Sequence, residues 1–419
     1  MGLNRREMLI GLGGLVAGAA AGNTSAAAAA RSAPHAAEAV PGFPRKADFN
    51  IGAGYTYING AYTHPMPIAA ADAYRRAIDR RSTLGAPPAV QSPSRMDPRA
   101  AFASLINARP SEISYIPNTS TGENLVVECL GVGKGTGNVV TDALHFEGAL
   151  VHLMELQNEG LDLRVVAPRE GRIDLKDLER VVDRNTKLIE VSFVAMYNGF
   201  QHDLKAVCDL AHAHGAYVYA DIIQGVGATP LDVRATGLDF AASATYKWLM
   251  GDFGLAFFYV REDLLGTVVR RPHWSYESAP DTSFHLSPFD PESPKAISYV
   301  PGKDASSYFQ LGTMASGVAA ALAVSIPYIQ SLGVDNIQRH REPLIQRLQQ
   351  EMPRLGFTPQ TPLDSRSPIV TFAHRDTATI ARKLEAAHVS IRVAPYWVRI
   401  APSVYNDMQD IERLLDALS

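Results

Sequence analysis

Lys247 is the residue of this sequence whose setting most needs a chemical explanation. It lies in SATYKWLMGDFGLAFFYV, residues 243–260, in a run without charge up to Asp252. A lysine is almost never fully buried without a partner, although its stem can be buried while its head reaches water. A desolvated lysine, by contrast, has a lowered pKa and a free amine that can form an imine. Taken alone, Lys247 fits the first alternative, and its companion motifs favour the second.

Asp221 and Gln224 follow a hydrophobic run in YADIIQGVG, residues 219–227. The carboxyl end of a parallel strand is where such sheets bind ligands, so a carboxylate there needs a cation. A pyridinium nitrogen supplies one, and the pair keeps the ring protonated as an electron sink. Gln224, one turn later, is placed to hydrogen-bond a ring hydroxyl. A cap on the following turn is the alternative role for Asp221.

Three further motifs contribute groups that could bind a cofactor or a substrate. PNTSTGENLVV, residues 117–127, places hydroxyls and free N–H groups at a helix start, which suits a phosphate, although an ordinary N-cap is the alternative. Phe146 could stack on a flat cofactor or belong to the core. Arg399 could grip a carboxylate or form a surface salt bridge. In this order, the motifs together predict a site for pyridoxal 5'-phosphate.

The elements that must position these residues alternate between strand and helix from about residue 100. Apolar runs predict strands at 113–117, 138–142, 161–167, 186–194, 216–222, 240–248 and 255–260. Such runs, separated by amphipathic helices, are typical of an α/β fold with a mostly parallel sheet covered on both faces.

The chain after this sheet changes character. Residues 270–306 are rich in proline, serine and aromatic residues and predict a long ordered loop. Helices at 312–331 and 335–351, a strand at 368–374, a helix at 377–387, strands near 389–394 and 397–401, and a helix at 407–418 indicate a smaller α+β domain. We therefore expect four parts: 1–35, 36–65, a large domain at 66–308, and a linking helix with the small C-terminal domain at 309–419.

Composition excludes several classes of function. The net charge of −4 over 419 residues gives no basic surface, so we expect no nucleic-acid partner. Two cysteines, Cys129 and Cys208, cannot build a metal cluster or a disulfide framework, and we expect no metal site.

The N-terminus has the pattern of an export signal. Arg5 and Arg6 precede an apolar run rich in glycine and alanine, followed by small residues to Ala30. This pattern predicts a twin-arginine signal peptide, and hence a periplasmic or otherwise exported protein without stable membrane insertion once the signal is removed. A retained membrane anchor is the alternative.

Over about residues 55–418, the chain resembles the class V aminotransferase family of fold-type I pyridoxal-phosphate enzymes. Its pattern is similar to isopenicillin-N-epimerase-like proteins, cysteine desulfurases and kynureninase. The matching stretches are YTYINGAYTHP, PNTSTGENLV, ADIIQGVGATPLDV, SATYKWLMGDFGLAFFYV, FQLGTMASGVAAALA and VRIAPSVYNDMQDIERLLDAL. The resemblance implies a large domain with a seven-stranded sheet and a small C-terminal domain.

The resemblance also implies a role for each candidate residue. Lys247 forms the aldimine with the cofactor and moves the proton at the substrate α-carbon. Cofactor contacts are implied for Asp221 (ring nitrogen), Gln224 (ring oxygen), Phe146 (stacking), and Ser120, Thr121, Thr245 and Tyr246 (phosphate). Arg399 binds the substrate carboxylate. Thr313 reaches the phosphate of a partner subunit, which implies a homodimer.

Two departures from the family pattern bear on the reaction. Desulfurases carry a catalytic cysteine on a loop between the lysine and the late arginine, and this chain has none between Lys247 and Arg399. That disfavours a group-transfer desulfurase but not a C–S lyase. The asparagine expected near VAMYNG is replaced by Ala195, and Asn198 is the candidate to compensate.

The resulting hypothesis is an exported pyridoxal-phosphate enzyme that acts on an amino-acid-like or amine-bearing metabolite. Aminotransferase-type tailoring of a secreted compound is favoured. A C–S lyase, an epimerase and a non-catalytic binding protein of the same fold remain as alternatives.

Overall fold

A computed structural model describes residues 40–83 and 97–419 of the chain. The predicted signal peptide, within residues 1–35, lies outside the described residues.

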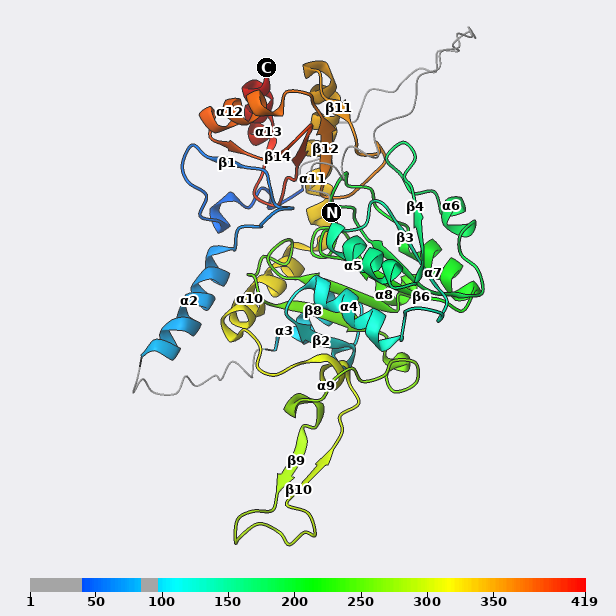
Figure 1. The fold of residues 1–419 in the computed structure, drawn as a ribbon. Helices are drawn as coiled ribbons and strands as arrows, with labels where there is room; N and C mark the ends of the chain where they lie inside the picture. The colour runs from blue at the N-terminus through cyan, green and yellow to red at the C-terminus, as the bar shows by residue number, and fades with distance from the viewer. Residues whose placement is uncertain (1–39, 84–96) are drawn as a thin grey trace. The chain divides into compact units, whose positions relative to one another are not determined.

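Seven strands form the main sheet, in the order β2–β8–β7–β6–β5–β3–β4 (Figure 1). They are β2 (Ile113–Ile116), β3 (Asn138–Asp142), β4 (Asp162–Val166), β5 (Thr186–Ser192), β6 (Tyr217–Asp221), β7 (Phe240–Ala244) and β8 (Ala256–Val260). Only β8 runs antiparallel to its neighbours within this sheet. The α/β fold with a mostly parallel seven-stranded sheet is therefore confirmed.

Helices cover both faces of this sheet because its central strands are buried on both sides. The helices around it are α3 (Pro98–Leu105), α4 (Thr119–Cys129), α5 (Glu147–Asn158), α6 (Leu175–Glu179), α7 (Leu204–Ala213) and α8 (Val233–Thr236). On one face, Leu125 of α4 and Leu153 of α5 share an apolar cluster with Leu188 of β5. On the other, α3 and α7 pack with a second cluster that includes Ile189. Successive residues of β5 thus serve opposite faces.

The C-terminal part of the chain forms a second, antiparallel sheet in the order β11–β12–β15–β14. Its strands are β11 (Thr358–Pro359), β12 (Val370–Ala373), β14 (Arg392–Ala394) and β15 (Trp397–Ile400). Four helices belong to this part: α10 (Ser316–Leu332), α11 (Val334–Glu351), α12 (Thr377–Ala386) and α13 (Met408–Leu418). The apolar sides of α11, α12 and α13 pack with β12 and β15 in a core of their own.

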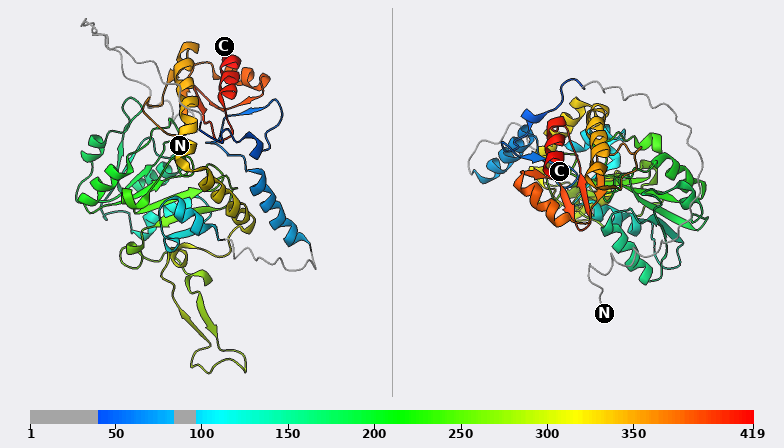
Figure 2. Two further views of the ribbon diagram at one scale, coloured as in Figure 1. Left: turned by 180° about the vertical axis from the view of Figure 1, so that it is seen from behind. Right: turned by 90° about the horizontal axis from the view of Figure 1, so that it is seen from above.

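The segment that precedes the main sheet joins this second part. Strand β1 (Thr56–Tyr57) pairs in parallel with β13 (Val389–Ser390). Helix α2 (Ile68–Ser82) lies beside α10, as Figure 2 shows from behind. In residues 40–83 and 97–419, no single helix has the length and apolarity to cross a membrane, although the bent pair Ser316–Leu332 and Val334–Leu355 meets those criteria jointly.

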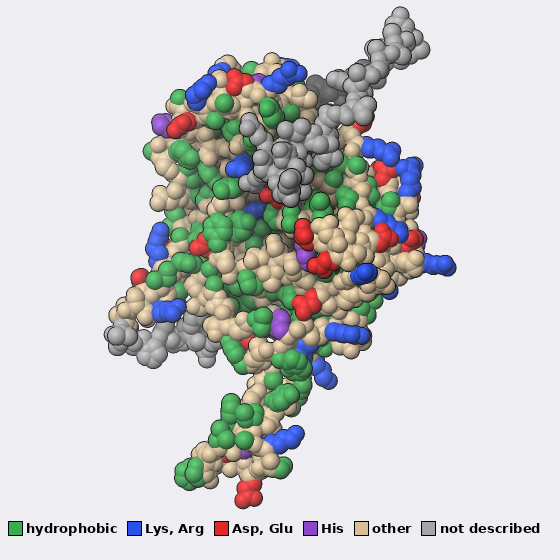
Figure 3. All heavy atoms as spheres, viewed as in Figure 1, with side chains coloured by type: hydrophobic (Ala, Val, Ile, Leu, Met, Phe, Trp, Pro, Cys, Tyr) green, Lys and Arg blue, Asp and Glu red, His purple; other side chains and the backbone are tan. Residues whose placement is uncertain are grey.

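The structure differs from expectation in residues 270–306. The predicted loop contains an antiparallel hairpin, β9 (Asp281–Phe284) with β10 (Ile297–Val300), followed by α9 (Ala305–Phe309). Both strands are exposed along their whole length, and their apolar side chains lie at the surface (Figure 3). With no buried face, these strands lack the in-out alternation by which a strand is recognised in a sequence.

Candidate active site

Lys247 lies in the turn between β7 and β8, just beyond the carboxyl end of β7. The turn is held by three hydrogen bonds: Thr245 Oγ1 to the carbonyl of Asp252 at 2.6 Å, Gly251 N to the carbonyl of Thr245 at 2.8 Å, and Met250 N to the carbonyl of Lys247 at 2.8 Å. Lys247 itself is 7% exposed, and its Nζ lies 5.6 Å from the centroid of the Tyr246 ring. The strand end therefore holds an amine in a largely apolar setting.

Burial lowers the pKa of Lys247 to about 8. The negative charge of Asp221 opposes this shift, and the positive charge of Arg399 adds to it. A lysine of this kind holds a substantial share of neutral amine near pH 8, which is what imine formation requires.

Asp221 is the last residue of β6 and is 5% exposed. Burial raises its pKa to about 6, against the opposing effects of the Ile223 N–H and the charge of Lys247. Ile223 N donates to Asp221 Oδ1 at 3.0 Å. A buried carboxyl in this state gains from a cationic partner such as a protonated ring nitrogen.

Gln224 is also buried, and both ends of its amide have partners within the protein. Its Nε2 donates to the carbonyl of Ala61 at 3.1 Å, and its Oε1 accepts from the indole of Trp248 at 3.2 Å. Gln224 therefore ties the N-terminal segment to the lysine turn, and its contact with a ring oxygen stays a prediction.

The predicted phosphate site is the start of helix α4. Asn118 is its N-cap and accepts from Thr121 N at 2.9 Å, while Ser120 is exposed. Gly122 lets this turn approach the sheet, since a Cβ there would lie 2.7 Å from the Cβ of Ala242. A helix start held against the sheet edge presents N–H groups and hydroxyls suited to an anion.

Thr121 and Thr313 line one cavity of about 170 Å³. Thr313 Oγ1 also lies 2.8 Å from the hydroxyl of Tyr276, and the pair forms a hydrogen bond. The contact of Thr313 with a partner subunit stays a prediction.

Phe146 is half-buried at the N-cap position of α5. Gly148 leaves room for its ring, because a Cβ there would lie 2.7 Å from Phe146 Cε1. Sequence reasoning did not assign its neighbour His145, whose Nδ1 hydrogen-bonds Ser192 Oγ at 2.9 Å. Ser192 lies opposite Asp221 in the β5–β6 register, so His145 belongs to the same sheet edge.

Arg399 lies in β15 and is 3% exposed. Its Nη1 donates to the carbonyl of Met196 at 3.1 Å, and its Nε is buried without a partner in the described structure. Burial lowers its pKa to about 10, with a further contribution from the charge of Arg392. An orphaned donor on a buried arginine calls for an acceptor from a ligand.

Asn198 differs from the other candidates. Its Nδ2 donates to the carbonyls of Gly171 at 2.7 Å and Gln360 at 3.4 Å, and its Oδ1 accepts from Phe200 N at 3.0 Å. Asn198 thus holds neighbouring loops together. Its side-chain amide is already engaged with backbone groups, and its role in substrate binding stays a prediction.

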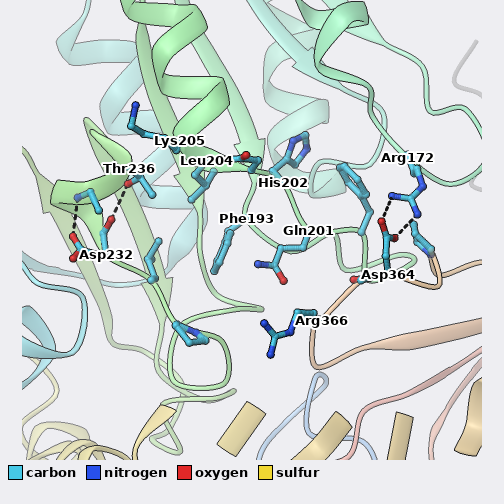
Figure 4. Close-up of a pocket in the computed structure, with 17 residues that line it drawn as sticks. Arg172, Phe193, Gln201, His202, Leu204, Lys205, Asp232, Thr236, Asp364 and Arg366 are labelled. Carbon is cyan, nitrogen blue, oxygen red and sulfur yellow. Dashed lines mark hydrogen bonds and ion pairs between the residues drawn. The ribbon is translucent and has the colours of Figure 1, made fainter. Parts of the chain in front are cut away.

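A larger cavity, of about 440 Å³, contains none of the predicted site residues (Figure 4). Phe193, Gln201 and His202 lie in its middle, and the ion pair between Arg172 and Asp364 closes one side.

The donor set at the sheet edge fits pyridoxal phosphate. A buried amine, a buried carboxyl with a raised pKa and an arginine with an orphaned Nε come from separate elements. The helix start at Asn118 and the ring of Phe146 add an anion site and an aromatic face. These are the groups that an aldehyde, a ring nitrogen, a phosphate and a substrate carboxylate need.

Comparisons with known proteins show which family the chain belongs to. Residues 95–414 match the family model "Aminotransferase class-V". A probable cysteine desulfurase of Methanothermobacter thermautotrophicus is 30% identical over 68% of this chain and 69% of its own. An uncharacterized aminotransferase, YcbU, of Bacillus subtilis is 25% identical over 77% and 82%.

Solved structures share the fold. The apo cysteine desulfurase of Thermococcus onnurineus NA1 has a TM-score of 0.75 at 22% identity, covering 90% of this chain and 98% of that one. The cystine C–S lyase C-DES, in complex with its reaction product cysteine persulfide, has a TM-score of 0.75 at 19% identity, covering 87% and 97%.

Fold and site together define a pyridoxal-phosphate-dependent enzyme of fold-type I, a transferase or a lyase. The chain belongs to the class V aminotransferase family.

Proposed function

We propose that this enzyme is exported and transfers the amino group of an amino-acid-like or amine-bearing metabolite, as a tailoring aminotransferase. The observation that carries the proposal is Lys247, buried at the sheet edge, with a pKa of about 8, between the charges of Asp221 and Arg399.

The residues at the sheet edge divide the work of holding the cofactor. Lys247 would hold its aldehyde carbon, Asp221 its ring nitrogen, and Ser120 and Thr121 its phosphate, while Phe146 would offer an aromatic face to the ring. The cofactor supplies an electron sink for the electrons left at the substrate α-carbon.

Lys247 and Arg399 act on the substrate. Arg399 binds the carboxylate, its Nε being a free donor for one of the two bonds. With the carboxylate fixed, the substrate α-carbon would face Lys247, whose amine would be free to accept the α-proton, and to return it to a neighbouring atom, once the substrate amine has replaced it on the cofactor.

A C–S lyase is the second candidate, because curated relatives include cysteine desulfurases and one structural neighbour is a cystine C–S lyase. Thiol-based sulfur transfer is less well supported. Cys129 and Cys208 are both buried, and burial raises the pKa of each to about 12. Strands β14 and β15 are joined by Pro395 and Tyr396 alone, which leaves no cysteine-bearing loop before Arg399.

The test supplies the pyridoxal-phosphate-loaded enzyme with a panel of amino acids and amines. A transaminase consumes the amine only when a 2-oxo acid acceptor is present, and it aminates that acceptor. Pyruvate and ammonia released without an acceptor, together with sulfide from cysteine or cysteine persulfide from cystine, would establish the lyase instead.

Export is part of the proposal and is supported by Arg5 and Arg6 before the apolar run. Fractionation of cells should place the wild-type chain outside the cytoplasm and the R5K/R6K variant within it. Equal retention of both chains in the cytoplasm would refute the proposal that the protein is exported.

We also propose that the enzyme is a homodimer. This proposal is supported by the exposed apolar side chains of the β9–β10 hairpin, among them Phe284, Leu286 and Phe289, because such patches mark interfaces. Light scattering of the purified protein should give twice the chain mass, and a monomer would contradict it.

A further inference from the structure

Arg399 has a second arginine directly beside it. In the antiparallel pairing of β14 and β15, Arg392 lies opposite Arg399, so both side chains leave the same face of the small sheet. Neither forms an ion pair with an acidic side chain in residues 40–83 and 97–419. Like charges at directly opposed positions destabilise a sheet, so this pair needs an anionic partner from elsewhere.

Arg392 is also placed at the site by Tyr62. Its guanidinium carbon lies 5.6 Å from the centroid of the Tyr62 ring. Tyr62 follows Ala61, whose carbonyl accepts from the buried Gln224 beside the lysine turn. Tyr62 is 54% exposed, and Arg392 is exposed as well, so the pair stands at the solvent side of the site while Arg399 stands at its buried side.

Lys247 and Arg392 are therefore linked through neighbouring residues. Tyr246 lies beneath the amine, Tyr62 acts electrostatically on Tyr246, Arg392 lies over Tyr62, and Arg399 acts on Lys247. Two cations line one side of these residues, one deep and one shallow. A substrate with a single carboxylate would engage only the deep one.

We propose that the substrate carries two carboxylates, the one beside the amine bound by Arg399 and a second, on the side chain, bound by Arg392. The substrate class is thus a dicarboxylic amino acid, free or at the end of a larger molecule. The inference rests on the proposed function, since it assigns the substrate of the same site. Arg392 is a specificity-determining residue, and the Tyr62 ring holds its guanidinium in place.

The experiment compares glutarate with glutaramate, its monoamide, as ligands of the pyridoxal-phosphate-loaded enzyme. The two have the same length and differ in one charge, and neither carries an amine that could react at Lys247. Isothermal titration calorimetry should show glutarate binding tighter than glutaramate. In R392Q, glutarate should bind about tenfold more weakly or worse, with glutaramate little changed.

Two further variants act as controls. Arg382 is an exposed arginine of α12 in the same part of the chain, and R382Q should keep the wild-type preference. R392K keeps a positive charge without the planar fork and should retain part of the preference.

Equal binding of the two ligands by the wild type, or a preference that R392Q leaves intact, overturns the inference while the proposed function stands. A wild-type protein that does not bind pyridoxal phosphate at Lys247 overturns both.

Discussion

Lys247 and Asp221 are buried close enough for each charge to shift the pKa of the other, yet they form no ion pair. Burial moves both groups toward neutrality, the amine to a pKa of about 8 and the carboxyl to about 6. A single molecule with an aldehyde at one position and a protonatable nitrogen at another satisfies both. The two buried groups are thus chemically complementary to pyridoxal phosphate.

The first prediction concerns the pH dependence of cofactor capture. The neutral form of Lys247 attacks the aldehyde, so the rate at which apoprotein takes up pyridoxal phosphate should fall about tenfold per pH unit below pH 8 and level off above it. Stopped-flow absorbance measures this rate. R399Q removes a charge that lowers the pKa of Lys247, so its midpoint should move to higher pH. A rate independent of pH between 6 and 8 would contradict the assignment.

The second prediction concerns the cofactor-free protein. The folded-state pKa of Asp221, about 6, lies above the ordinary value near 4, so the folded state binds more protons than the unfolded one between those values. This stabilising contribution is full below about pH 4 and is lost as the pH rises through 6. An asparagine cannot ionise, so the free energy of unfolding of D221N should not fall over this pH range. D221N should therefore stabilise the apoprotein at pH 7.5 by about 2–3 kcal/mol relative to wild type.

Urea unfolding of both apoproteins at pH 4.5 and 7.5 measures the effect. The same variant should bind the cofactor more weakly, because the ring nitrogen loses its partner. An apoprotein whose stability D221N leaves unchanged at both pH values would show that Asp221 is solvated.

The third prediction concerns the close approach of α4 to the sheet. An alanine at position 122 would place its Cβ 2.7 Å from Ala242 Cβ and 3.0 Å from Ile116 Cδ1. We expect G122A to destabilise the protein by about 1–3 kcal/mol and to weaken the binding of the cofactor's phosphate.

A matched control exists in α10, where the nearest atom to a Cβ at Gly317 would be in the Tyr74 ring, at an ordinary contact distance of 3.4 Å. G317A should be neutral or stabilising, because alanine favours a helix. Thermal unfolding and a cofactor titration compare the two. Equal effects of the two substitutions would mean that packing at α4 does not position the phosphate site.

The fourth prediction concerns the two cysteines. Both thiols are buried with pKa values of about 12, so they are neutral and sheltered at working pH. The C129A/C208A variant should retain turnover per cofactor-loaded site, and iodoacetamide should leave the wild type active. Loss of turnover in a variant that still binds cofactor would favour thiol chemistry.

The sequence predicts the main strands closely because each is a short apolar run that ends at turn residues. It places Lys247 and Asp221 at one sheet edge for the same reason, since carboxyl ends of parallel strands meet there. The sequence does not predict side-chain contacts between segments that are far apart in the chain. The contacts of Gln224 with Ala61 and Trp248 join remote segments, and no local pattern predicts them.

The pairing of Arg392 with Arg399 was missed for a different reason. The stretch RVAPYWVR is symmetric about Pro395 and Tyr396, and a two-residue turn there sets the register that opposes the arginines. Tyr396 adopts a φ of 67°, which is uncommon for tyrosine, so the sequence predicts a break between the two strands but not the tight turn that pairs them. The symmetric spacing was the available signal.

Trapping the bond between Lys247 and pyridoxal phosphate shows whether this lysine holds the cofactor covalently. Apoprotein is mixed with pyridoxal phosphate, its visible absorption recorded, the complex reduced with borohydride, and the modified peptide located by mass spectrometry. We predict a new absorption band in the wild type, none in K247A, and the reduced adduct on Lys247. A wild type without the band, or an adduct on another lysine, would rule out Lys247 as the residue that holds the cofactor.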